Sequence, residues 1–351
     1  MKAFAIPSML NRLTLRQIDS LNIGVMLVSA ACAFARPFET FLFVYAFLGP
    51  LHYVTEISWL HDRQYFTKRQ YDFVLLLALA MVVTLKYFGL VPAPRGTDSF
   101  LIFLAFAAAL IFVTVKKFSV RCVLLLAAAA AAVLVHGNPA FEPTFGVFLP
   151  TLIHVFVFTT LFILAGALRG RSTLGIFSLL VFAGCSLFLL SFRPDRSHNF
   201  ATDYIRGAYA GFTNLNYLFI SIFNLHKFDA GASFASQKFV LDFNGFLYKD
   251  RTALAAMSFI AFAYTYHYLN WFSKTSVIQW HDVSRVRLYA VVAVWTGSIA
   301  LYGYDYRLGL KWLFFLSLTH VLLEFPLNHK TLINLACQVV EIFSARRFAA
   351  P

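Results

Sequence analysis

Four histidines lie inside long apolar stretches of the sequence: His52, His154, His267 and His320. An ionisable side chain is costly inside a bilayer, so it usually faces the interior of a helix bundle and often marks function. One such histidine is more often a neutral imidazole bonded to a neighbouring helix than a ligand. Four of them together favour a shared site, and imidazole suits iron, copper and zinc. We therefore predict that these four histidines bind a metal ion.

Two of the four histidines are followed by a carboxylate at the same spacing. Glu56 comes four residues after His52 and Glu324 comes four residues after His320, so each pair shares one helix face. Such a carboxylate can ligate the metal, or it can accept the second ring N–H of a ligating histidine and fix its tautomer. A structural His–Glu hydrogen bond is the alternative. Glu56 and Glu324 are therefore the candidate catalytic residues.

The same two segments share a longer pattern, H-x3-E-x4-H, which ends at His61 in the first and at His329 in the second. His61 is followed by Asp62 at an expected helix end, close to Trp59. Since tryptophan is common at membrane interfaces, we interpret His61 as part of an interfacial anchor. No role is assigned to His329.

Composition identifies the elements that must position these residues. Of the 351 residues, 60% are hydrophobic and 13% are charged, whereas soluble domains carry about a quarter charged residues. A compact soluble protein of this length cannot bury so much apolar surface. The composition excludes a nucleic-acid-binding protein, a cytosolic α/β enzyme and a secreted disulfide scaffold. It predicts an all-α, polytopic transmembrane helical bundle in which residues 1–351 form a single membrane domain.

A helix needs about 20 mostly apolar residues to cross a bilayer. The net charge of +13 comes from basic residues in short segments between the apolar runs. That placement indicates membrane topology rather than an anionic partner. It predicts both termini on the cytoplasmic side, and we expect the membrane to be a bacterial inner (cytoplasmic) membrane. The ten expected spans are 20–35, 38–60, 73–91, 100–115, 121–135, 145–168, 173–192, 253–272, 288–303 and 308–325.

Residues 193–252 differ from the rest because polar stretches flank one short apolar piece, 212–225. We expect an extramembrane or interfacial insertion in which 212–225 forms a re-entrant helix. If that piece spanned, the later basic loops would lie outside. A topology with eleven spans is the alternative.

In the ten-span topology the four histidines lie on helices that run in one direction. At about 1.5 Å per residue, His52 and His267 lie roughly 21 Å below their helix starts, His320 roughly 18 Å and His154 roughly 14 Å. Helix tilt absorbs such differences. The spacing therefore predicts that the four imidazoles meet at one level of the bundle.

Absent motifs narrow the chemistry further. The sequence has no HExxH zinc-protease motif, no glycine-rich phosphate loop and none of the usual histidine boxes of membrane desaturases. Histidine ligation within an apolar bundle favours oxygen chemistry at non-haem iron, with haem, copper or zinc as alternatives. The expected partners are the lipid bilayer and a lipophilic small molecule, and no nucleic acid. A haem- or quinone-linked redox protein and a proton-coupled transporter of a lipophilic molecule are the alternative functions.

Several of these segments resemble the Brp/Blh-type integral-membrane β-carotene dioxygenases. Gly49-Pro50-Leu51-His52 with Glu56 is similar to the first motif of that family, and His154 corresponds to a histidine on a middle span. The aromatic segment 264–268 around His267 is similar to a later motif, and the segment from His320 to Glu324 is similar to the last one.

The resemblance implies an iron dioxygenase that cleaves a carotenoid-like substrate. It also implies that histidines of several spans hold the iron. The sequence departs from the family pattern at several places: glutamates replace the family's aspartates, and the chain is longer by about two spans and the insertion at 193–252. Tyr53 follows the first histidine where the family has glycine, and Trp271 stands where the family has a second histidine on the later span. His320 would then replace the missing ligand.

Overall fold

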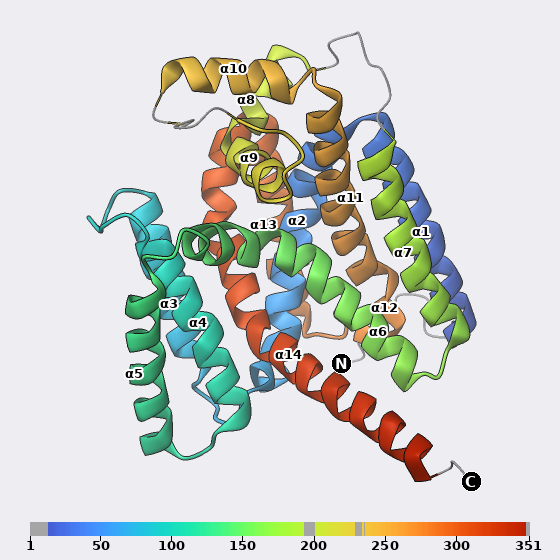
Figure 1. The fold of residues 1–351 in the computed structure, drawn as a ribbon. Helices are drawn as coiled ribbons and strands as arrows, with labels where there is room; N and C mark the ends of the chain where they lie inside the picture. The colour runs from blue at the N-terminus through green and yellow to red at the C-terminus, as the bar shows by residue number, and fades with distance from the viewer. Residues whose placement is uncertain (1–12, 193–200, 229–233, 235, 349–351) are drawn as a thin grey trace. The chain divides into compact units, whose positions relative to one another are not determined.

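The computed structural model describes residues 13–192, 201–228, 234 and 236–348, which form helices joined by turns and loops, with no strand among them (Figure 1). This confirms the all-α class. The elements are α1 (Leu15–Ala35), α2 (Pro37–His61), η2 (Gln64–Phe66), α3 (Phe73–Tyr87), α4 (Thr97–Thr114), α5 (Phe118–Val135), η3 (Glu142–Phe158), α6 (Thr159–Arg169), α7 (Thr173–Ser191), α8 (Asp203–Tyr209), η4 (Ala210–Phe212), α9 (Thr213–Ile222), α10 (Gln237–Leu247), α11 (Arg251–Ser273), α12 (Thr275–Ile278), α13 (Arg285–Tyr304) and α14 (Tyr306–Phe348).

Each of the ten expected spans falls on a helix. Within the described residues, 8 helices are long and apolar enough to cross a membrane: α1, α2, α4, α5, the continuous helix of η3 and α6, α7, α13 and α14 as far as Glu341. The other two are α3, an apolar helix of 15 residues, and α11, which has 23 residues but is less apolar.

The expected insertion at 193–252 contains short helices. The predicted re-entrant helix at 212–225 coincides with α9, which has 10 residues and is therefore shorter than the ~20 residues that a span needs. Residues 193–200, 229–233 and 235 of this region lie outside the described part of the chain. The interfacial position of the region stays a prediction.

The chain forms two compact units. The first contains Met1–His52 and Ser172–Trp312, and the second contains Tyr53–Arg171 and Leu313–Pro351. The division falls inside α2 and inside α14, so each of these helices contributes to both units. The expectation of one membrane domain stays a prediction.

Helix α11 is the core of the first unit. It packs against α1, α7, α9 and α10, and α1, α7 and α11 run side by side in Figure 1. Its side chains are buried on all faces, so this helix lies inside the unit rather than at its surface. Asp250 caps the start of the helix, because its carboxylate accepts hydrogen bonds from the backbone N–H groups of Thr252 and Ala253 at 2.7 and 3.3 Å. A capped, enclosed helix gives His267 a fixed position.

The second unit is organised around α4, which packs against α3, α5 and η3. A buried ion pair joins two of its helices, because Arg121 at the start of α5 donates to Asp72, 2.5 Å away, just before α3. Arg121 also donates to the carbonyl of Val115 at 2.8 Å. These bonds satisfy a guanidinium that would otherwise be costly to bury.

Candidate metal centre

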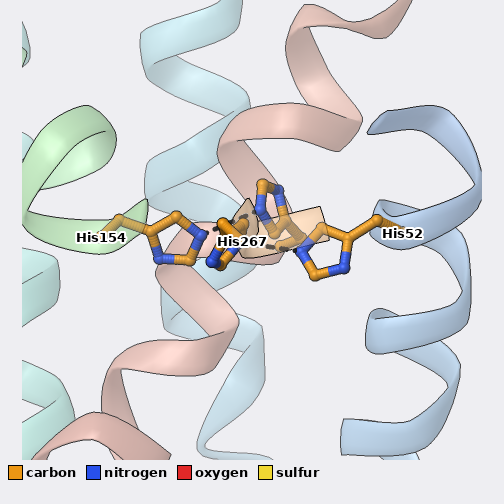
Figure 2. Close-up of side chains that lie close together, drawn as sticks. His52, His154 and His267 are labelled. Carbon is orange, nitrogen blue, oxygen red and sulfur yellow. Dashed lines mark hydrogen bonds between the residues drawn. The ribbon is translucent and has the colours of Figure 1, made fainter. Parts of the chain in front are cut away.

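The first unit brings two of the predicted histidines together. His52 on α2 and His267 on α11 are both buried, and their Nε2 atoms lie 3.1 Å apart (Figure 2). The two rings are nearly perpendicular, with an interplanar angle of 82°. Each ring therefore directs the same nitrogen, Nε2, at its neighbour.

Aromatic rings of α11 surround His52 in this first pair. The centroids of Tyr268 and Trp271 lie 5.2 and 5.4 Å from that of His52, and the ring of Phe272 follows at 6.5 Å. Trp271 meets His52 edge-on, at an interplanar angle of 81°. Packing of this kind restricts the imidazole to a narrow range of orientations.

The second unit holds the other two histidines as a similar pair. His154 on η3 and His320 on α14 are buried, with their Nε2 atoms 3.2 Å apart. Helix η3 is π-helical and contains Pro150, four residues before His154. The ring of Tyr53 stacks on His320, at a centroid distance of 4.3 Å and an interplanar angle of 25°.

A carboxylate contacts the second pair from the side opposite to Nε2. The Nδ1 atom of His154 lies 3.1 Å from Oε2 of Glu324, and both side chains are buried. The spacing along α14 suggested a pairing of Glu324 with His320, on the same helix. Instead, Glu324 contacts the histidine of the neighbouring η3. Glu56 is equally buried, and its role stays a prediction.

All four predicted histidines belong to one group. His52, His154, His267 and His320 are buried, and each offers a ring nitrogen within 4.8 Å of those of the others. Figure 2 labels the first three of them. Two nitrogens bound at about 2.1 Å to one ion are about 3.0 Å apart at a right angle and about 3.4 Å apart at the tetrahedral angle. The separations of 3.1 and 3.2 Å within the pairs fall in this range. A buried group of four histidines could thus bind a metal ion.

The two H-x3-E-x4-H segments end differently. The His61 side chain is 60% exposed and contacts Asp62, in keeping with a position at a helix end. His329 is buried, and its Nε2 donates to the carbonyl of Phe106 at 2.8 Å. Neither histidine joins the metal-binding group.

Two buried side chains of the second unit were given no role at the candidate site from the sequence. Tyr53 follows His52 directly, and residues adjacent on a helix point in different directions, so its stacking on His320 was not foreseen. Asn328 lies four residues after Glu324 on α14 and is 1% exposed. Its spacing from Glu324 was the available signal, because it extends the row formed by His320 and Glu324.

The first unit also contains an apolar groove of about 480 Å³, lined by parts of α2, α8, α13 and the start of α14. Leu42, Ala46 and Phe47 of α2 form part of its wall, and Glu39 lies there as an acidic group. None of the candidate site residues lines this groove, so it is separate from the metal-binding group.

No protein-family model, no curated protein and no solved structure matches this chain.

Proposed function

We propose that the chain is a membrane-embedded non-haem iron oxygenase acting on a long hydrophobic, carotenoid-like substrate. The observation that carries the proposal is the group of four buried histidines with ring nitrogens within 4.8 Å of one another. The resemblance of the histidine segments to the Brp/Blh-type dioxygenases supplies the substrate class. In this proposal the protein lies in a bacterial inner membrane with both termini cytoplasmic.

The spacing of the nitrogens favours a bare ion over a haem. A haem places its macrocycle between two axial imidazoles. Two further ring nitrogens within 4.8 Å of both axial ones would then overlap with that macrocycle. A single ion bound by four imidazoles needs no such space and keeps coordination positions open.

Charge balance supports a divalent ion. Glu56 and Glu324 are both buried, at 2% exposure each. Two buried carboxylates are costly without compensating positive charge. Four neutral imidazoles leave the charge of a divalent cation intact, so the two carboxylates would balance it.

The chain's own residues have distinct roles in this proposal. Nε2 atoms of His52, His154, His267 and His320 would hold the iron, which when bound supplies the activation of dioxygen. The Glu324 carboxylate, 3.1 Å from Nδ1 of His154, would favour a proton on Nδ1 and leave Nε2 free to bind the ion. The apolar surroundings exclude water and accept the substrate. Cleavage of one C=C bond by one O₂ gives two carbonyl groups, so the reaction consumes no reductant.

Expression in carotenoid-accumulating bacteria tests the proposal. We expect bleaching of the pigment, with two carbonyl products per cleaved molecule and about one iron per purified chain. The matched variants are His52→Ala, which should lose both iron and bleaching, and His61→Ala on the same helix, which should keep both. Folded wild-type protein that stays free of metal after iron supplementation would end the proposal. A His52→Ala variant that bleaches the pigment as well as the wild type does would also end it.

A further inference from the structure

A third polar side chain continues the row that His320 and Glu324 form on α14. Asn328 lies one helical turn beyond Glu324 and is 1% exposed. Within the described part of the chain, neither its amide nitrogen nor its amide oxygen has a hydrogen-bond partner. A buried amide without partners is unusual, because native interiors satisfy such groups with protein atoms or ordered water.

The geometry of α14 shows where a partner fits. Side chains four residues apart on a helix are neighbours, with about 5–6 Å between their Cβ atoms. Asn328 therefore lies beside Glu324, yet the two do not bond directly. The carboxylate of Glu324 instead has Oε2 3.1 Å from Nδ1 of His154. A water needs two to four polar partners, and the Glu324 carboxyl and the Asn328 amide supply them.

Helix α2 can be compared with α14 at this position, because it too carries a histidine followed four residues later by a glutamate. His52 and Glu56 are followed at the next turn by Leu60, which is fully buried. An apolar residue thus fills this position in α2, whereas α14 carries an amide there.

We propose that Asn328 is a positioning residue, which holds an ordered water against the Glu324 carboxyl and so completes a chain from His154 through Glu324 and the water to Asn328. The water would fix the carboxyl in the rotamer that faces His154 Nδ1. The effect on metal affinity rests on the proposed function, while the hydration of Glu324 does not.

Two measurements on Asn328 variants test this inference. The first is a titration with Co²⁺ as the metal probe, followed by its visible absorption. The second is the infrared carboxyl band of Glu324, assigned by its loss in Glu324→Gln. In Asn328→Leu we expect about 10-fold weaker Co²⁺ binding, the lower end of effects seen for groups that orient metal ligands, together with a shifted band. Asn328→Ser, which keeps a hydrogen-bonding group and room for water, should restore both toward wild type.

A matched control uses another buried amide. Asn216 accepts a hydrogen bond from Tyr209 at 2.6 Å, and Asn216→Leu should reduce stability but leave both the Co²⁺ spectrum and the Glu324 band unchanged. If Asn328→Leu does not fold, Asn328→Ala removes the amide without adding bulk and decides instead. An unchanged band and affinity in the folded variant overturn the inference. A wild-type protein that binds no Co²⁺ while its band still shifts on substitution of Asn328 overturns the proposed function and leaves the hydration of Glu324 standing.

Discussion

The two histidine pairs reach nearly the same geometry in different surroundings. The Nε2 atoms are 3.1 Å apart in the pair of His52 and His267, and 3.2 Å apart in the pair of His154 and His320. In the first pair, the rings of Tyr268, Trp271 and Phe272 pack around His52. In the second pair, a carboxylate of α14 contacts His154 and one aromatic ring stacks on His320.

This difference separates two ways of fixing an imidazole. Packed aromatic rings restrict the orientation of the ring but do not select which nitrogen carries the proton. A carboxylate at Nδ1 selects the tautomer and increases the basicity of the opposite nitrogen. Substitutions in the first pair should therefore act through shape, and those in the second through hydrogen bonding and charge.

The largest expected effect tests whether the two pairs act together. Alanine at His52 removes a ligand from the first pair, and alanine at His154 removes one from the second. If one ion is shared, either variant lowers the iron content from about one per chain to nearly none. Metal analysis of the purified proteins checks this. A wild-type content of two, with one ion retained in each variant, would show that each pair binds its own ion.

The next effect concerns the carboxylate of the second pair. Glu324→Gln keeps the size of the side chain but removes its charge, so it should weaken metal binding by about 10- to 100-fold. Competition with a chelator measures the loss. Trp271→Phe in the first pair is the companion variant, and it should change the affinity much less because a ring remains against His52. Equal losses in the two variants would contradict the distinction between the pairs.

A smaller effect is expected at Tyr53, which stacks on His320. Aromatic pairs contribute about 0.5–1.5 kcal/mol beyond the area they bury. Tyr53→Leu should therefore lower the midpoint of thermal unfolding and weaken metal binding several-fold, whereas Tyr53→Phe keeps the stacking ring. Thermal unfolding of the metal-free and metal-loaded forms provides the measurement. If Tyr53→Leu and Tyr53→Phe had the same unfolding midpoints in both the metal-free and the metal-loaded form, the stacking of Tyr53 would make no contribution to the second pair.

The last effect concerns stability and not metal binding, and it lies at the end of the helix that carries His267. Burial lowers the pKa of Lys274 to about 8, although the charge of Asp19 acts in the opposite direction. Between that value and the ordinary lysine pKa of about 10.4, the unfolded chain binds more protons than the folded one. Stability should therefore rise with pH in this window. Melting curves between pH 8 and 10 should show the rise in wild type and a flatter dependence in Lys274→Met.

The sequence alone was sufficient to predict the helical class and to identify which histidines lie together. Long apolar runs specify membrane-length helices, and His52, His154, His267 and His320 stand out because polar groups are costly within such runs. Counting residues from the expected helix starts also predicted that the four would meet. Their grouping within 4.8 Å confirms that expectation.

The partners of those histidines were harder to predict. Spacing along one helix identifies residues on the same face, but it does not specify which neighbouring helix they contact. Glu324 thus contacts His154 on η3, while the four-residue spacing pointed to His320. The stacking of Tyr53 on His320 depends in the same way on packing between helices, which a single sequence does not encode locally.

The enclosure of α11 has a consequence for biogenesis. This helix carries His267, Asn270 and three tyrosines, so it is less apolar than the 8 helices that meet the requirements for crossing a membrane. A translocon that sorts segments by their individual hydrophobicity would retain α11 poorly. Its insertion should therefore depend on α1 and α7, which pack against it and are synthesised earlier. The insertion of α11, the most polar of the spans, would then be the step that limits folding of the chain, and it would require α1 and α7 to be inserted first.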